Sequence, residues 1–337
     1  MPNVRNGSII VNYDIRGAGP PAILFNHTSI SNLSWSERFL ESLAEELTVV
    51  TPDHRGTGLS SPALVELSLA DLAADGIAVL DAEGIEKAVV IGTSMGGAVA
   101  QEFALKFPDR LSPLVLMGTF AGNKHFVPPD PSVITLFERA LQLESKIERW
   151  RQALPATYSR DFLRNFEDLA LELELKGFRY TTDETLKWHG QAVSKFEAYD
   201  QLPLVSARCL IIHGTADPVI PFEKRPDPRR TTHQLGLGCA RGCRSPSSRR
   251  ETPGNRRANT TLRFRPRLDE MKTLIRKTLD SDMGSLSRQH RTRKTFDRKH
   301  LLEDGCDIRT IQELLGHEHA WTGWGKGSQH LSFTPYL

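Results

Sequence analysis

Between Val89 and Ala100 the sequence reads VVIGTSMGGAVA, and this stretch decides the fold. Its apolar, β-branched start is typical of a buried strand, and the small residues at its end lead into a helical segment. Gly92, Ser94 and Gly96 form a Gly-x-Ser-x-Gly motif between the two. A serine on such a sharp strand-to-helix turn is lifted clear of the sheet and can act as a nucleophile. We predict this role for Ser94; the alternative is a glycine-rich turn with a capping serine.

The residue after this serine is predicted to help stabilise negative charge. The amide of Met95 would lie at the N-terminus of the following helix, where the helix dipole adds positive potential. An amide in this position can bind the oxyanion that forms when a nucleophile attacks an acyl carbon. Met95 is therefore predicted to supply one amide of an oxyanion hole.

Strand and helix patterns alternate along the first half of the chain. Besides the strand and helix around Ser94, the pattern predicts strands at 8–16, 22–26, 48–51, 114–117 and 208–213, and helices at 34–47 and 69–80. Such βαβ units predict an α/β fold with a doubly wound, mainly parallel sheet and helices on both faces. Reactive groups in these sheets gather outside the carboxyl ends of the strands.

The strand pattern stops between residues 124 and 200. Apolar residues such as Ile134, Phe137 and Trp150 recur there at helix-like spacing. A helical insertion between two sheet strands would cap their carboxyl ends, exclude water and shape an acyl pocket. The alternative is an ordinary peripheral layer of helices. The expected units are a core at 1–123, a helical cap at 124–200 and the resumed core at 201–223.

Asp217 follows the last predicted strand, after the turn Gly214-Thr215-Ala216. A carboxylate after a late strand fits the chain order serine, acid, histidine of a catalytic triad. Its role would be to orient an imidazole that deprotonates Ser94 and to balance its charge. The alternative is a turn aspartate before Pro218, which is a common arrangement.

Composition limits the function classes. The chain has 337 residues, of which 39% are hydrophobic and 25% are charged, enough for one large domain or two. No apolar run reaches the length of a membrane span, and the N-terminus lacks the apolar region of a signal peptide. We therefore expect a cytoplasmic protein without a membrane partner. The four cysteines show neither metal-ligand spacing nor a disulfide framework, so no metal and no cofactor is expected.

The charge balance changes abruptly after residue 223. Residues 1–223 carry 19 Lys and Arg against 29 Asp and Glu, whereas residues 224–267 carry 13 against 2. The basic stretch has no apolar period and is rich in Pro, Ser, Thr and Gly, as in segments that do not order themselves. We interpret 224–285 as a low-order linker. The alternative is weak, nonspecific binding of nucleic acid through the arginines of 224–267.

Over about residues 5–222 the motifs together resemble the α/β-hydrolase family with a helical cap. Three segments carry the resemblance: DHRGTGLS at 53–60, GTSMGG at 92–97 and GTADP at 214–218. His27-Thr28 stands where the family has His-Gly, which implies that the amide of Ser29 is the second oxyanion donor. The resemblance implies a serine hydrolase that cleaves an ester or related acyl compound through an acyl-enzyme, acting on a small molecule without a cofactor.

The chain departs from the family pattern after residue 223. The family's catalytic histidine lies on a loop beyond the last strand, and the corresponding window, about 242–247, contains no histidine. His233 and His290 are the remaining candidates for the base. Without an imidazole partner, Ser94 would lose orders of magnitude in rate. An interrupted reading frame would explain the departure.

A second resemblance covers about residues 290–319. His290-x-x-Arg293 and the LGH at 315–317 are similar to two boxes of the tyrosine recombinases, or integrases. That family's nucleophilic tyrosine would fall near Lys326, where no tyrosine stands, so recombinase chemistry is not expected of residues 286–337. We predict a short helical remnant in an otherwise irregular C-terminal third.

Two other functions remain open on the sequence. One is a catalytically inactive hydrolase–recombinase fusion whose basic tail contacts DNA. The other, a weaker alternative, is a cofactor-free haloperoxidase or a C–C bond hydrolase, because a shared fold does not fix the function. The sequence predicts neither the substrate nor the oligomeric state.

Overall fold

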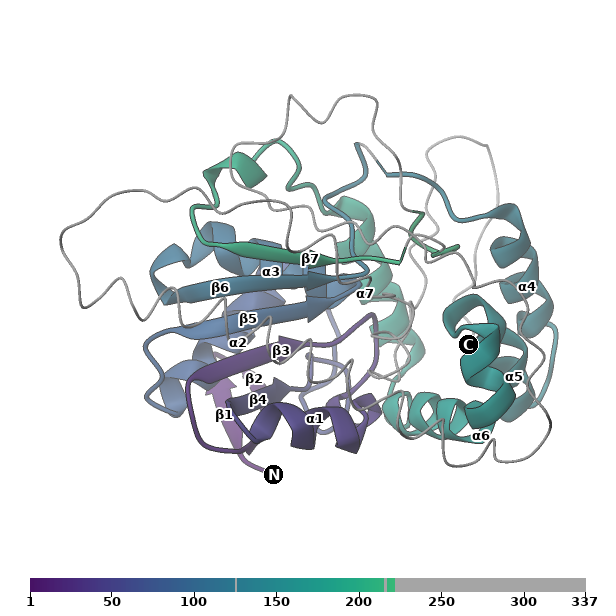
Figure 1. The fold of residues 1–337 in the computed structure, drawn as a ribbon, viewed down its shortest axis with the longest axis horizontal. Helices are drawn as coiled ribbons and strands as arrows, with labels where there is room; N and C mark the ends of the chain where they lie inside the picture. Colours follow the sequence, from purple (N-terminus) through teal and green to yellow (C-terminus); the bar gives the residue numbers. More distant parts are fainter. Residues whose placement is uncertain (125, 215–216, 222–337) are drawn as a thin grey trace, which may run out of the picture.

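The sheet at the centre of the fold is mainly parallel, as predicted. The computed structural model describes residues 1–124, 126–214 and 217–221 (Figure 1). In these residues seven strands pair in the order β1-β2-β4-β3-β5-β6-β7. The strands are β1 (Asn3–Asn6), β2 (Ile9–Arg16), β3 (Pro21–Phe25), β4 (Thr48–Pro52), β5 (Ala88–Thr93), β6 (Leu111–Met117) and β7 (Cys209–Ile212). The first two pairings are antiparallel and the other four are parallel.

Helices cover both faces of this sheet, which confirms the predicted α/β fold. They are α1 (Glu37–Ala44), α2 (Leu69–Ala82) and α3 (Met95–Lys106), with short 3-10 turns η1 (Asn32–Ser34), η2 (Pro108–Arg110) and η3 (Leu202–Leu204). Alternate residues of each central strand pack on opposite faces of the sheet. Ile91 packs in the cluster that contains α1, whereas Val90 packs in the larger cluster that contains α2 and α3. Strands buried on both faces explain the continuous apolar runs in the sequence.

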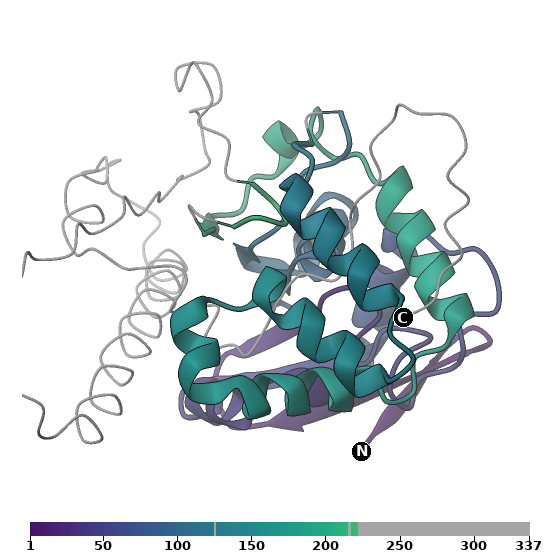
Figure 2. The same cartoon turned by 90° about the vertical axis from the view of Figure 1, so that its right-hand side faces the viewer.

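Four helices lie between β6 and β7, in the stretch where the sequence predicts helices. They are α4 (Pro131–Leu141), α5 (Lys146–Thr157), α6 (Arg160–Gly177) and α7 (Asp183–Lys195). Each begins after a residue whose side chain accepts a hydrogen bond from a backbone amide of the first turn: Asp130, Ser145, Ser159 and Thr182. Helices α4, α5 and α6 lie beyond the carboxyl ends of β5 and β6 (Figures 1 and 2). We call residues 131–195 the helical insertion.

Several predictions fall outside the described residues. They are the basic linker, the nucleic-acid contact through 224–267, the integrase-like fragment and the two candidate bases His233 and His290. These remain predictions. Among the described residues, no helix combines the length and apolar character needed to cross a membrane, and no cluster of His, Cys, Asp or Glu is arranged to hold a metal ion.

The helical insertion contains a buried carboxyl group, Glu174 on α6. Only 3% of this residue is exposed, and the hydroxyl of Tyr158 donates a hydrogen bond to its Oε1 at 3.1 Å. The ring centroid of Trp150, on α5, lies 4.4 Å from that of Phe178, the residue that follows α6. Burial raises the pKa of Glu174 to about 8. The side chain is therefore neutral at pH 7 and packs as a hydrogen-bonded polar group.

Glu174→Gln is expected to remove a loss of stability that the wild type shows as the pH rises from 4.5 to about 8. In the wild type, the contribution of the neutral Glu174 is fully present below its ordinary pKa of 4.5 and is lost as the pH rises through about 8. Over that interval the free energy of unfolding should fall by up to about 1.4 kcal/mol per pH unit. Glutamine keeps the acceptor for Tyr158 but cannot ionise.

Urea unfolding at pH 5 and pH 9 measures this difference. The Gln variant should match the wild type at pH 5 and be more stable at pH 9. Asp168→Asn, at an exposed position of the same helix, is the control and should follow the wild type at both values. Equal pH dependence of wild type and Glu174→Gln would contradict the prediction.

Candidate active site

Ser94 lies on a sharp turn between β5 and α3. Its backbone is left-handed, with φ 51° and ψ −120°, and among the described residues only Ser29 is another non-glycine residue with positive φ. The side chain is fully buried, and its Oγ has no hydrogen-bond partner among the described residues. Such a backbone costs about 1–3 kcal/mol and tends to occur at functional sites. The strand, turn and helix that the sequence predicted around Ser94 are therefore present.

Two glycines permit this turn because the backbones on either side nearly touch. A Cβ added to Gly92 would lie 2.1 Å from the carbonyl oxygen of Gly96, and a Cβ on Gly96 would lie 2.1 Å from that of Phe25. The first turn of α3 thus packs directly on the backbones of β5 and β3. The carbonyl oxygen of Asn26 is also close, 2.4 Å from the Cβ position of Gly96. The loop that follows β3 therefore begins beside the N-terminus of α3.

Met95 is the first residue of α3, so its amide has no acceptor within the helix. The carbonyl of Ser94 accepts from the amide of Gly97 at 2.9 Å and from the hydroxyl of Thr119 at 2.6 Å, which fixes the peptide that joins Ser94 to Met95. The partial positive charge of the helix N-terminus adds to the potential at this amide. The oxyanion role of this amide stays a prediction.

The loop after β3 holds Ser29, the other predicted oxyanion donor. Its φ is 59°, and its amide donates to Nδ1 of His189, on α7, at 3.1 Å. The hydroxyl of Thr181 donates to the carbonyl of Ser29 at 2.6 Å. In this structure, therefore, the Ser29 amide is bonded to a histidine of the helical insertion. The amide of the preceding residue, Thr28, has no hydrogen-bond partner among the described residues.

Asp217 lies at the carboxyl edge of the sheet, five residues after β7 ends. It is 8% exposed, and its Oδ1 accepts from the amides of Val219 and Ile220, both at 2.9 Å. Its Oδ2 lies 3.7 Å from Nε2 of His213, which is also 2.7 Å from the carbonyl oxygen of Ile220. These bonds hold the carboxylate in a tight turn. Because β5, β6 and β7 are parallel neighbours, Ser94 and Asp217 follow strands that end at the same edge.

The segment 53–60 supports the loop that carries Ser29. Asp53 is buried, and it accepts from the amide of Asn32 at 2.7 Å, from Nδ2 of Asn12 at 2.9 Å and from the amide of Leu59 at 3.1 Å. Burial raises the pKa of Asp53, although these three bonds oppose the rise. A Cβ on Gly58 would lie 2.0 Å from Oδ2 of Asp53. The segment therefore ties β2, the loop after β3 and its own turn together.

His189 is a site residue that the sequence analysis missed. It is fully buried, and its Nε2 lies 3.0 Å from the carbonyl oxygen of Arg55. Its ring meets that of His54 edge-on, with centroids 6.1 Å apart. The only signal in the sequence is periodicity: Thr185, His189, Ala192 and Val193 are the buried residues of α7 and lie on one helical face. Nothing local marks this histidine as a partner of Ser29.

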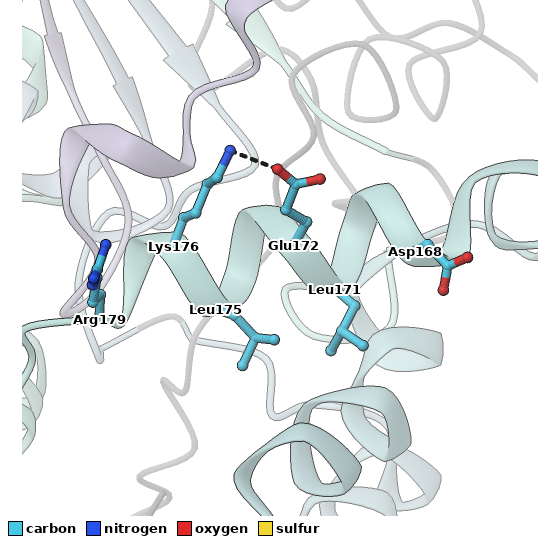
Figure 3. A pocket seen from close by; sticks show the side chains of 6 residues that line it. All are labelled: Asp168, Leu171, Glu172, Leu175, Lys176 and Arg179. Carbon is cyan, nitrogen blue, oxygen red and sulfur yellow. Dashed lines mark ion pairs between the residues drawn. The ribbon is translucent and has the colours of Figure 1, made fainter.

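A surface hollow of about 430 Å³ lies along α6 (Figure 3). It is lined by Asp168, Leu171, Glu172, Leu175, Lys176 and Arg179, and so contains no residue of the predicted site. Lys176 and Glu172 form an ion pair at 2.6 Å, one turn apart on the same helix. The lining residues form a stripe on one helix and its end, so we interpret the hollow as a feature of the helix surface and not as an active site.

Comparison with known proteins identifies the family. Residues 21–234 match the alpha/beta hydrolase fold family, and the chain belongs to it. A protein of Azorhizobium caulinodans named "Putative carbamate hydrolase RutD" is 35% identical over 127 residues, which are 38% of this chain and 48% of that protein. The chain thus spans about half the length of this relative.

Two further similar proteins match over longer stretches. The rhodomycin D methylesterase DnrP of Streptomyces peucetius is 30% identical over 237 residues, with 60% of this chain and 77% of that protein covered. The crystal structure of a hydrolase from Pseudomonas aeruginosa is similar with a TM-score of 0.53 and 27% identity, covering 63% of this chain and 79% of that one. This chain is accordingly an enzyme of the hydrolase class.

Gly92→Ala is expected to destabilise the protein because the added methyl would collide with backbone rather than with a movable side chain. We expect a loss of about 2 kcal/mol or more in the free energy of unfolding. The matched control is Gly190→Ala on α7, where a Cβ would meet nothing within 4 Å. That change should stabilise by about 0.5–1 kcal/mol. Chemical unfolding measures both variants. If Gly92→Ala left the free energy of unfolding unchanged, this would contradict the close approach of α3 to β5.

Proposed function

We propose that the chain is a serine hydrolase that cleaves an ester or related acyl compound, with Ser94 as the nucleophile. The observation that carries the proposal is the buried, left-handed Ser94, whose hydroxyl has no partner among the described residues and precedes the N-terminus of α3. A structural serine in the same place would be expected to cap the helix, and the Ser94 side chain makes no capping bond. The names of the two relatives, a methylesterase and a carbamate hydrolase, support a carbonyl substrate.

In this mechanism Ser94 Oγ attacks the acyl carbon and passes its proton to an imidazole base. The carbonyl electrons move onto oxygen, and that oxyanion is stabilised by the Met95 amide and by an amide of the loop after β3. The tetrahedral intermediate collapses to an acyl-enzyme, and the base returns the proton to the leaving alcohol. Water then attacks the acyl-enzyme by the same route and releases the acid. Asp217 would orient the base and stabilise its charged form.

The helical insertion would act as a cap in this mechanism. Helices α4, α5 and α6 lie beyond the carboxyl ends of β5 and β6 (Figure 1), and Ser94 directly follows β5. Exclusion of water by such a layer strengthens the electrostatic interactions with the oxyanion. The insertion would also shape the acyl pocket and so select the substrate.

Ser94→Ala tests the proposal directly. Hydrolysis of p-nitrophenyl acetate and butyrate by the wild type should exceed that by Ser94→Ala by about 10³-fold or more in kcat/KM, because the nucleophile is lost. A fluorophosphonate probe should label the wild type at Ser94, as mass spectrometry of the peptide would show, and should leave the variant unlabelled. Equal rates in the two proteins, together with no labelling, would reject the proposal.

The base can be identified by exchanging the two candidate histidines separately. If His233 or His290 supplies the imidazole, its replacement by Gln should lower kcat by about 10³-fold or more, with little change in KM. The other variant serves as the matched control and should keep the wild-type rate. Wild-type rates in both variants would exclude both histidines as the base.

A further inference from the structure

Three polar side chains at or before helix α7 bind the backbone of two loops at the carboxyl edge of the sheet. Thr181 donates to the carbonyl of Ser29 at 2.6 Å, and Thr185 donates to the carbonyl of Gly56 at 2.9 Å. His189 bonds to both loops, through the Ser29 amide at 3.1 Å and the carbonyl of Arg55 at 3.0 Å. A helix that belongs to the insertion is thereby tied to the loop that follows β3 and to the loop that follows β4.

The bonds to His189 define its tautomer. The Ser29 amide can only donate, so Nδ1 of His189 must accept and carries no proton. The Arg55 carbonyl can only accept, so Nε2 must carry the proton. Burial lowers the pKa of His189 to about 3, helped by the neighbouring His54. The ring is therefore a neutral bridge with one acceptor and one donor, both in use.

Ser29 needs such support because of its backbone. A left-handed conformation in a residue other than glycine costs roughly 1–2 kcal/mol. The amide of Ser29 is held by His189 and its carbonyl is held by Thr181, so the bonds on both sides of this residue come from the insertion. Thr28, whose amide has no hydrogen-bond partner in the part of the chain that the structure describes, precedes it in a loop that begins beside the first turn of α3.

We propose that His189 is a positioning residue for the oxyanion hole: by accepting the Ser29 amide it holds the loop so that the Thr28 amide, together with that of Met95, meets the oxyanion. This inference rests on the proposed function. It assigns the second donor to Thr28 instead of Ser29, because the amide of Ser29 is already bonded to a ring nitrogen. It also gives the insertion a role in transition-state stabilisation besides covering the site.

Two substitutions separate the functions of the two ring nitrogens. In His189→Asn the side-chain oxygen can take the place of Nδ1 and accept from Ser29, whereas the bond to Arg55 is lost. In His189→Gln the amide nitrogen can take the place of Nε2 and reach the Arg55 carbonyl, whereas the Ser29 amide loses its acceptor. Thr185→Val is the matched control, because it removes a bond from the same helix to the other loop.

The readout is kcat and KM for p-nitrophenyl butyrate, with Ser94→Ala as the background. We expect His189→Gln to lower kcat about 10- to 100-fold with KM within about twofold, since a displaced oxyanion donor affects the transition state more than substrate binding. His189→Asn should restore kcat to within about threefold of the wild type, and Thr185→Val should keep it. Losses of kcat that are equal in His189→Gln and Thr185→Val, or larger in His189→Asn than in His189→Gln, would overturn the inference.

A spectroscopic measurement on the wild type keeps the inference testable if a variant does not fold. NMR of protein labelled with ¹⁵N-histidine should show the His189 ring, identified as the signal that is lost in the His189→Asn spectrum, to be neutral with an unprotonated Nδ1 throughout pH 5–8. A His189 ring that is protonated at Nδ1, or that titrates in this range, would overturn it. Equal activities of the wild type and Ser94→Ala would instead reject the proposed function, so the two failures are distinct.

Discussion

In the first turn of α3 the helix backbone touches the backbones of two strands, and this contact determines the geometry of the site. No side chain separates Gly96 from the carbonyl of Phe25 or Gly92 from the carbonyl of Gly96. The chain must reverse direction within one residue between β5 and α3, and Ser94 takes the left-handed conformation that such a turn demands. The same contact brings the loop after β3 to the helix N-terminus. The positions of the proposed nucleophile and of the amides proposed to face the oxyanion thus depend on one packing constraint.

The helical insertion is coupled to this site through backbone groups. Thr181, Thr185 and His189 bind the carbonyl oxygens or amide of loops whose own sequences provide no partner for them. The C-terminal end of α6 adds to this contact, since the amide of Ser31 donates to the carbonyl of Gly177 at 3.0 Å. Movement of the insertion would therefore change the conformation of the loop after β3. In the proposed mechanism the insertion therefore both covers the site and, through Thr181 and His189, positions the loop after β3.

The structural features that depend on neighbouring residues along the chain were predicted well from the sequence. The strand, turn and helix around Ser94, the parallel core and the helices of the insertion all follow from local periodicity and from small residues. The short strand β1 was missed because it is four residues long and pairs only at the edge of the sheet. The partner of Ser29 was missed for another reason. His189 lies 160 residues away along the chain, so nothing near Ser29 in the sequence indicates that its amide has this acceptor.

Burial shifts the pKa of several groups that frame this site toward the neutral form. It lowers the pKa of His189 and of His54, and it raises that of Asp53. Arg55 keeps its charge because Asp75 accepts from its Nε and Nη2 at 2.8 and 2.7 Å. In the proposed mechanism, the groups that stabilise negative charge beside Ser94 are oriented amides and the N-terminus of α3. Fixed dipoles of this kind are already oriented before charge develops, so stabilising an oxyanion requires little reorganisation. The bonds that fix those amides, among them the one from Ser29 to His189, are therefore part of the proposed mechanism.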